Sequence, residues 1–238
     1  MSAKGILLDL DNTLYDYLPC ATAGIRAAHR VYKSYKDVGF ITFKAAYDMA
    51  REQIHQSLCG QAAMHDRLLY FQRMCENDPR TIPLESAVAM YQAYWAAYFR
   101  MMALFPGARS FLQWCRRIGL PVVLLTDLMA EVQLRKVSYL RLGPYLQAVV
   151  TSEEAGVEKP AAAIFHLGLR KLGVNASNAL MIGDHPERDI GGARRLGIHT
   201  IQVACGSGVE IGCGLTRPAC IAKSFAAVRG HVAAYVKG

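Results

Sequence analysis

Short apolar runs rich in Val, Ile and Leu recur along the chain, and each ends at a polar or turn-forming residue. Such runs are typical of strands that are buried on both faces. Helical patterns separate the later runs, and this alternation predicts βαβ units. We therefore expect an α/β fold in which helices cover both faces of a parallel sheet. The expected strands are Ile6–Leu8, Val122–Leu125, Ala148–Val150, Leu180–Ile182 and Thr200–Val203.

The first strand is followed by a long segment that lacks strand patterns and is helical throughout. An all-helical insertion after the first strand of a parallel sheet would lie over the carboxyl ends of the strands, where ligands bind in open α/β sheets. We therefore expect a catalytic core formed by residues 1–15 and 104–238, and a helical cap formed by residues 16–103. The helices expected in the cap are Leu18–Tyr35, Thr42–Leu58, Ala62–Glu76 and Leu84–Met102.

A repeated pattern of cation, apolar residue and glycine predicts four helix ends. Glycine readily adopts the left-handed conformation that often follows a helix, and a cation in the last turn interacts favourably with the helix dipole. Helix ends therefore explain much of the positive charge of the chain. The four stretches are Arg117–Gly119, Arg141–Gly143, Lys171–Gly173 and Arg195–Gly197.

The chain has 238 residues and a formal net charge of +8, a basicity that nucleic-acid-binding proteins share. No stripe of basic and aromatic residues accompanies this charge, so we expect no nucleic-acid partner. Apolar residues make up 53% of the chain and charged residues 19%, as is typical of a globular protein with a sizeable core. The composition therefore indicates an ordinary folded protein. It does not determine the oligomeric state, for which a monomer or a homodimer is expected.

The sequence also predicts where the protein is found. No apolar run approaches the roughly 20 residues that cross a bilayer, so we expect no membrane partner. The N-terminal run Ile6–Leu8 is followed at once by acids and has no small-residue cleavage site, unlike a signal peptide. The seven cysteines form no CxxC pair, as is typical of free thiols in a reducing compartment. The expected location is therefore cytoplasmic.

Candidate catalytic residues stand at the carboxyl ends of four expected strands. Asp9 and Asp11 come directly after the first strand, and alternation in an extended segment places them on one face, about 6–7 Å apart. Two carboxylates at this distance share a metal ion readily, and they repel each other without one. Taken alone, the pair is equally typical of a polar strand end with turn-forming residues.

Two further strands are followed by residues that suit a phosphate group. Thr126 and Asp127 come after the second strand, where a hydroxyl and a backbone N–H are able to bind phosphate oxygens. Lys159 precedes Pro160, which starts a helix, and a cation near a helix N-terminus is unfavourable unless an anion lies close by. Each feature alone has an ordinary explanation, as a turn or as a solvated lysine.

The fourth strand leads into Gly183 and Asp184, and Asp189 lies in the first turn of the next helix. The glycine allows a tight turn, and Asp184 is expected to project from the strand end. An acid such as Asp189 at the start of a helix is often only a cap. All these residues nevertheless reach the same edge of one sheet, since the carboxyl ends of parallel strands lie together.

These motifs, and their order along the chain, resemble those of the haloacid dehalogenase superfamily of hydrolases. The order is Asp-x-Asp-x-Thr, then Thr, then Lys, then Gly-Asp-x4-Asp. The resemblance extends over essentially the whole chain, including the helical insertion, which is similar to the family's cap of the first type. It implies a Rossmann-like parallel sheet with helices on both faces and an all-helical cap inserted after the first strand.

The resemblance implies roles for individual residues. Asp9 would be the nucleophile and would form an aspartyl-phosphate, while Asp11 would protonate the leaving oxygen and then deprotonate the hydrolytic water. Thr126 and Lys159 would bind the phosphoryl oxygens. The family often has asparagine where this chain has Asp127. The N–H of Asp127 is expected to serve the phosphate, and a carboxylate that pointed inward would disfavour highly charged substrates.

The implied cofactor is Mg²⁺, an ion that prefers hard oxygen ligands. Asp9, the backbone carbonyl of Asp11, and Asp184 would bind it. Asp189 would orient these groups, with direct contact to the ion as the alternative, and Thr13 would brace the nucleophile loop.

Dehalogenases of the family attack carbon, need no metal and typically lack an acid at the position of Asp11. The motif therefore favours a magnesium-dependent phosphohydrolase that acts on a small phosphorylated metabolite. Two alternatives to the phosphohydrolase remain. One is a phosphomutase of the same superfamily, and the other is a catalytically silent binding protein with this fold. Candidate substrate contacts in the cap are Tyr17, Arg51, His55 and His65.

Overall fold

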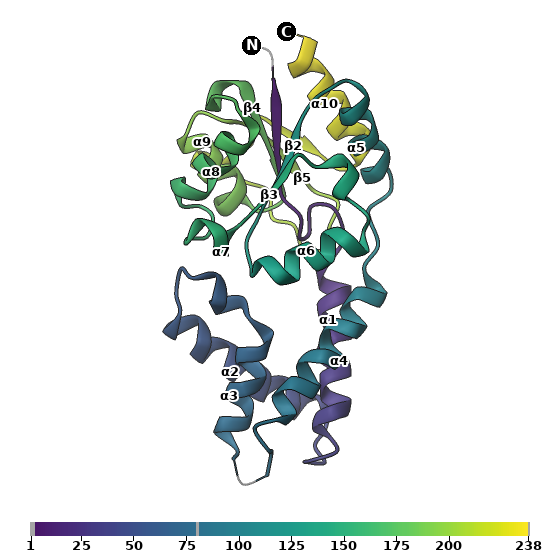
Figure 1. The fold of residues 1–238 in the computed structure, drawn as a ribbon, viewed down its shortest axis with the longest axis vertical. Helices are drawn as coiled ribbons and strands as arrows, with labels where there is room; N and C mark the ends of the chain where they lie inside the picture. The colour runs from purple at the N-terminus through teal and green to yellow at the C-terminus, as the bar shows by residue number, and fades with distance from the viewer. Residues whose placement is uncertain (1–2, 80, 238) are drawn as a thin grey trace. The chain divides into compact units, whose positions relative to one another are not determined.

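The computed structural model describes residues 3–79 and 81–237 (Figure 1). The chain divides into two compact units. The first, which we call the α/β unit, comprises Met1–Tyr17 and Ala103–Gly238. The second, which we call the helical unit, comprises Leu18–Met102 and is inserted into the first.

The α/β unit contains a parallel sheet of six strands in the order β3-β2-β1-β4-β5-β6. This arrangement confirms the α/β fold expected from the apolar runs. The three-residue edge strand β6 was not predicted, because it is too short to show a pattern of its own. The strands are β1 Gly5–Leu8, β2 Val122–Thr126, β3 Ala148–Thr151, β4 Ala179–Gly183, β5 His199–Val203 and β6 Cys220–Ala222.

Helices cover both faces of this sheet: α8 and α9 lie on one side, and α5 and α10 on the other (Figure 1). The connections also contain three short turns of 3-10 helix and one π-helical segment. The 3-10 turns are Gly143–Tyr145, Ala176–Asn178 and Gly214–Thr216, and the π-helical segment is Pro186–Gly191. The α-helices of the unit after the insertion are α5 Ala108–Arg117, α6 Ala130–Tyr139, α7 Ser152–Ala155, α8 Ala162–Leu172, α9 Gly192–Arg195 and α10 Phe225–Lys237.

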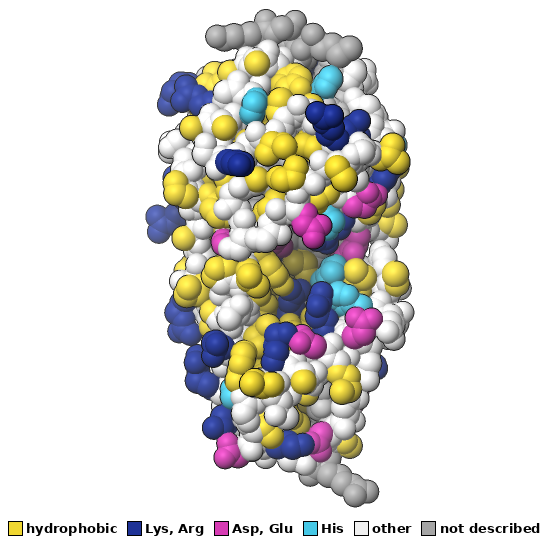
Figure 2. Space-filling view, turned by 180° about the vertical axis from the view of Figure 1, so that it is seen from behind, with side chains coloured by type: hydrophobic (Ala, Val, Ile, Leu, Met, Phe, Trp, Pro, Cys, Tyr) yellow, Lys and Arg dark blue, Asp and Glu magenta, His cyan; other side chains and the backbone are white. Residues whose placement is uncertain are grey.

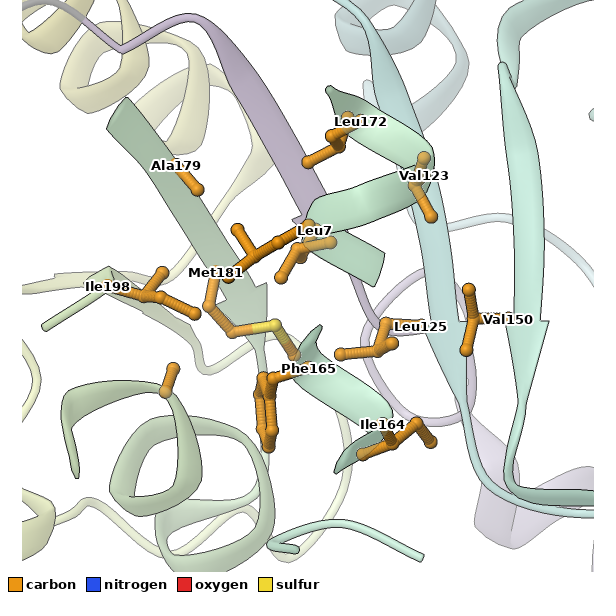
Figure 3. Close-up of a cluster of buried hydrophobic side chains, with 12 residues drawn as sticks. Leu7, Val123, Leu125, Val150, Ile164, Phe165, Leu172, Ala179, Met181 and Ile198 are labelled. Atoms are coloured by element: carbon orange, nitrogen blue, oxygen red, sulfur yellow. The ribbon is translucent and has the colours of Figure 1, made fainter. Parts of the chain in front are cut away.

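The core beneath α8 is apolar and close-packed. Leu7 and Leu125 on the sheet lie against Phe165 of α8, and all three side chains are fully buried (Figure 3). The helix approaches so closely that a Cβ added at Gly168 would lie 2.7 Å from a methyl carbon of Leu7. This packing holds the central strands in place, and the candidate catalytic residues follow those strands.

Within its described residues, 18–79 and 81–102, the helical unit contains four α-helices and one turn of 3-10 helix. The single helix expected over Ala62–Glu76 is wrong, because the chain forms the 3-10 turn and then starts a new helix. Asp66 separates the two, and its side chain accepts a hydrogen bond from the N–H of Leu68, which caps the new helix. The elements are α1 Tyr17–Tyr32, α2 Phe40–Ser57, the 3-10 turn Ala62–His65, α3 Arg67–Asn77 and α4 Ser86–Met101.

Three of the four expected glycine helix ends are confirmed. Gly119, Gly173 and Gly197 have φ values of 70°, 70° and 75°. The expectation for Gly143 is wrong, since Arg141 takes the left-handed conformation instead, with φ 50°. The helix before it ends at Tyr139, so the chain turns two residues ahead of the glycine.

In the described part of the chain, no helix is long and apolar enough to cross a membrane. All seven cysteines are free thiols. On the face shown in Figure 2, Lys and Arg side chains occur in separate groups between apolar, acidic and histidine side chains, without forming one continuous stripe.

Candidate active site

The strand order places three of the predicted site residues side by side. β1 lies between β2 and β4, so the segments that follow these three strands meet at one edge of the sheet. The N–H of Asp9 donates to the carbonyl of Ile182 over 2.9 Å, which extends the pairing of β1 with β4 by one residue. Asp9, Thr126 and Asp184 therefore leave the sheet at neighbouring positions.

Three carboxylates gather at this edge. Asp9, Asp184 and Asp189 each offer an oxygen, and these oxygens all lie within 4.8 Å of one another. Lys159 Nζ donates to Asp9 Oδ1 and to Asp189 Oδ1, over 2.7 Å in each case. Asp9, Asp189 and Lys159 are buried, so these ion pairs are shielded from water. We call Asp9, Asp184 and Asp189 the acid group.

The acid group has an excess of negative charge. Burial raises the pKa of Asp9 well above its ordinary value, with Lys159 opposing and Asp189 and Asp184 adding to the shift. Burial, followed by the charge of Asp189, raises the pKa of Asp184 to about 6. Burial alone would lower the pKa of Lys159, but Asp189 and Asp9 raise it well above the usual range. One ammonium therefore faces three carboxylates.

This donor set fits a hard divalent cation. Mg²⁺ takes oxygen ligands, commonly one or two carboxylates, and keeps several of its waters. A second positive charge beside Lys159 would also offset the repulsion that raises the pKa of Asp184. The acid group is thus able to hold a metal ion, and Asp189 belongs to it.

The loop after β1 braces the acid group. Thr13 Oγ1 donates to Asp9 Oδ2 over 2.7 Å and lies 3.3 Å from Asp184 Oδ1. The amide of Asn12 donates to Asp184 Oδ2 over 2.9 Å. Asn12 adopts φ 66°, a left-handed conformation that asparagine tolerates better than most residues. Both side chains therefore link the loop after β1 to the end of β4.

The carboxylate of Asp11 does not belong to the acid group. Lys136 Nζ, on α6, lies 2.7 Å from Asp11 Oδ1 and 2.8 Å from Asp11 Oδ2. The Tyr15 hydroxyl and the Gln133 amide also donate to this carboxylate. Burial alone would raise the pKa of Asp11, but Lys136, with Tyr15 and Gln133, lowers it below its usual value.

The sequence interpretation missed Gln133 and Lys136. Their spacing of three residues places them on one face of a helix, and this was the available signal. It does not show toward which neighbour that face turns.

Asp127 uses its carboxylate within the protein. Asp127 Oδ1 accepts a hydrogen bond from the N–H of Lys159 over 3.0 Å, and Asp127 Oδ2 lies 3.7 Å from the guanidinium of Arg188. Burial raises the pKa of Asp127, while Lys159 and Arg188 oppose the shift. The side chain thus orients the loop that carries Lys159.

His185 caps the turn after β4. Its Nδ1 accepts hydrogen bonds from the N–H groups of Glu187 and Arg188, each over 3.2 Å. An acceptor nitrogen requires the neutral ring, and burial, with help from Arg188, lowers the pKa of His185. His185 is half-buried and serves the local backbone.

Gly183 is required for space, whereas the sequence interpretation assigned it to a tight turn. A Cβ at this position would lie 2.5 Å from the carboxyl carbon of Asp189. We expect Gly183→Ala to displace Asp189 and to lower the free energy of unfolding by about 1–3 kcal/mol, as overpacking usually does. Urea unfolding measures this change. Gly230→Ala is the matched control, because a Cβ there meets nothing within 4 Å. Equal stability of the two variants would contradict the prediction.

Of the candidate contacts in the helical unit, two lie together. The rings of His55 and His65 are 5.0 Å apart between centroids, and His55 Nε2 lies 2.8 Å from the Tyr70 hydroxyl oxygen. Burial, followed by the charge of Arg51, lowers the pKa of His55 to about 4. His55 is therefore neutral at physiological pH.

Comparison with known proteins places the chain in a family. The profile of the haloacid dehalogenase-like hydrolases matches residues 3–197. The chain is 40% identical over 200 residues to the ribulose-1,5-bisphosphate 5-phosphatase of Halopiger xanaduensis, covering 84% of each chain. It is 29% identical to the glyceraldehyde 3-phosphate phosphatase of Methanocaldococcus jannaschii, covering 85% of this chain and 86% of that one.

A solved structure shows the same fold. The haloacid dehalogenase-type phosphatase of Thermococcus onnurineus superimposes with a TM-score of 0.74 at 19% identity, and the match covers 98% of both chains. The family profile spans the sheet, the acid group, Lys159 and the helical insertion. The chain therefore belongs to the haloacid dehalogenase-like hydrolase family.

Proposed function

We propose that this protein is a magnesium-dependent phosphatase that hydrolyses a small phosphorylated metabolite through an aspartyl-phosphate on Asp9. One observation carries the proposal: the acid group lies at the carboxyl edge of the sheet, with Lys159 in contact with its two buried members. Carboxylates, an ammonium and a hydroxyl in this arrangement suit phosphoryl transfer, which depends on positioning and charge stabilisation.

In the proposed reaction Asp9 attacks the phosphorus atom of the substrate. Lys159 and the Thr126 hydroxyl bind the phosphoryl oxygens, and the N–H of Asp127 adds a further donor. Asp11 gives a proton to the leaving oxygen and later accepts one from the water that hydrolyses the intermediate. Asp9, Asp184 and the backbone carbonyl of Asp11 would hold Mg²⁺, with Asp189 beside them.

The ion would supply a fixed positive charge against the charge that develops on the phosphoryl group. Thr13 keeps the nucleophile in place through its hydrogen bond to Asp9. Because Lys159 contacts both Asp9 and Asp189, substrate phosphate must share this ammonium with the two carboxylates.

Phosphorylated sugars are the proposed substrate class. The relatives named above act, by their names, on ribulose 1,5-bisphosphate and glyceraldehyde 3-phosphate. The helical unit would act as a cap that selects among such esters, with His55, His65, Arg51 and Tyr17 as candidate contacts. We also propose that the protein acts as an enzyme in the cytoplasm, where phosphorylated metabolites of this class are available to it.

The test is a panel of phosphorylated metabolites assayed for free phosphate with and without Mg²⁺. The panel should include both esters named above, and p-nitrophenyl phosphate as an unspecific probe. Release of phosphate that requires the metal supports the proposal. Isomerised product without free phosphate would indicate a mutase instead, and no turnover of any ester would indicate a binding protein.

We expect Mg²⁺ binding to depend on pH. The ion requires the carboxylate form of Asp184, whose pKa is about 6 in the metal-free protein. Affinity should therefore fall as the pH drops below about 6, by about tenfold per unit through Asp184, and protonation of Asp9, whose pKa burial also raises, should add to the fall. Calorimetric titration with Mg²⁺ at several pH values measures this. Asp184→Asn should lose most of the affinity, and unchanged binding would contradict the assignment.

A further inference from the structure

Helix α6 directs two buried polar side chains toward the loop after β1. Gln133 and Lys136 are both fully buried, and they lie one turn apart on the same face of the helix. Lys136 Nζ contacts both carboxylate oxygens of Asp11, at 2.7 and 2.8 Å. An ammonium that contacts both oxygens holds the carboxylate in one orientation.

Gln133 connects the same carboxylate to the proposed phosphate site. Its Nε2 lies 3.2 Å from Asp11 Oδ2, 2.5 Å from Thr126 Oγ1 and 2.6 Å from the carbonyl oxygen of Asp127. The amide donates to the oxygen of Thr126, and the Thr126 hydroxyl in turn donates to the carbonyl oxygen of Asp127 over 3.3 Å, an acceptor that a phosphoryl oxygen would replace when substrate is bound. One side chain thereby orients both Asp11 and Thr126.

Stability alone does not account for this arrangement. Transfer of an ammonium from water into the protein interior carries a large desolvation penalty, and well-packed apolar residues are often as stabilising as a buried ion pair. Lys136 is fully buried, whereas the Asp11 side chain is 22% exposed. The buried lysine therefore contacts a carboxylate that is itself partly exposed to solvent. Such exposure suits a group that accepts a proton from water.

We propose that Lys136 and Gln133 are positioning residues for the hydrolysis of the aspartyl-phosphate, the second step of the proposed function on which this inference rests. In that step the oxygen of a water forms a bond to phosphorus and the bond between phosphorus and Asp9 breaks. The proton of the water passes to the Asp11 carboxylate. Lys136 orients that carboxylate so that it acts as the base. Gln133 contacts both Asp11 and Thr126, and so fixes the position of the carboxylate relative to the threonine hydroxyl.

The experiment separates the two steps with p-nitrophenyl phosphate, in the presence of Mg²⁺. Nitrophenolate leaves without a proton, so kcat/KM for this probe reports formation of the intermediate, and kcat reports its hydrolysis when that step is slow. For Lys136→Met we expect kcat to fall about 10- to 100-fold, in the range of general-base effects. KM should fall by a similar factor, so that kcat/KM changes little. Rapid mixing should show a burst of about one nitrophenolate per protein.

Lys136→Arg retains a cation with several donors and should recover part of kcat. Lys171→Met removes a lysine that pairs with Glu154 outside the site, and should leave kcat and KM unchanged. If Lys136→Met does not fold, Lys136→Gln is judged by the same criterion, since it keeps a donor without the charge.

A structural role for Lys136 would reduce the active fraction, so kcat and kcat/KM would fall together and the burst would shrink. That result, or unchanged kinetics, overturns the inference while the proposed function stands. If the wild-type protein hydrolyses no phosphate ester in the presence of Mg²⁺, the proposed function fails and the inference fails with it.

Discussion

Asp9→Asn is expected to lower phosphatase turnover by at least about 10⁴-fold, the scale of loss seen when a catalytic nucleophile is removed. An amide cannot attack phosphorus to form the acyl phosphate, although it keeps the size of the side chain. The variant should fold, because Asn keeps an oxygen that accepts the Thr13 hydrogen bond, and because it removes one carboxylate from the crowded acid group. Release of free phosphate, measured on the best substrate of the panel, gives the size of the effect.

Asp48→Asn provides the matched control for this prediction. It makes the same change at an exposed acid of the helical unit, where Asp48 pairs with Lys44 at the surface. Its turnover should equal that of the wild-type protein. Substantial turnover by Asp9→Asn, beyond what slow deamidation restores, would rule out the covalent route through this residue.

Lys159→Met is expected to have the largest effect on stability. The ammonium of Lys159 contacts Asp9 and Asp189, and all three side chains are at least 94% buried. Removing one partner of a buried ion pair leaves uncompensated charge and typically lowers the free energy of unfolding by about 3–5 kcal/mol. Turnover should also be lost, since the proposed phosphate ligand is missing. Urea unfolding of the metal-free protein measures the first effect.

Two controls make this prediction specific. Lys44→Met removes an exposed lysine and should change the free energy of unfolding by no more than about 1 kcal/mol. Adding Mg²⁺ should recover part of the stability of Lys159→Met, because the cation would neutralise the acid group. A variant as stable as the wild-type protein would show that the buried carboxylates do not depend on Lys159.

Much of the fold could be predicted because strands and helices have local periodicity. The five predicted strands are confirmed within one residue at each end, and their alternation with helices was sufficient to indicate the parallel sheet. The errors concern short or subtle signals. Strand β6 has only three residues, and the break at Asp66 is marked by the hydrogen bond that caps α3.

The candidate site could be predicted only in part. The residues that follow the central strands were identified because parallel strands bring their carboxyl ends to one edge. The partners of these residues were not identified. Arg188 pairs with the Asp127 carboxylate, and Lys136 pairs with Asp11, through side chains whose directions no spacing reveals.

The sequence by itself determined most of the secondary structure, the order of the strand-end motifs and the family. Periodic burial depends on neighbours along the chain, and strand topology then limits where each motif can lie. Only the tertiary structure decided which charges meet. Lys159 reaches Asp9 across 150 residues, and Lys136 reaches Asp11 across 125. Such contacts depend on how α6 is rotated against the sheet and on where the loop before α8 lies, and the packing of the whole unit sets both.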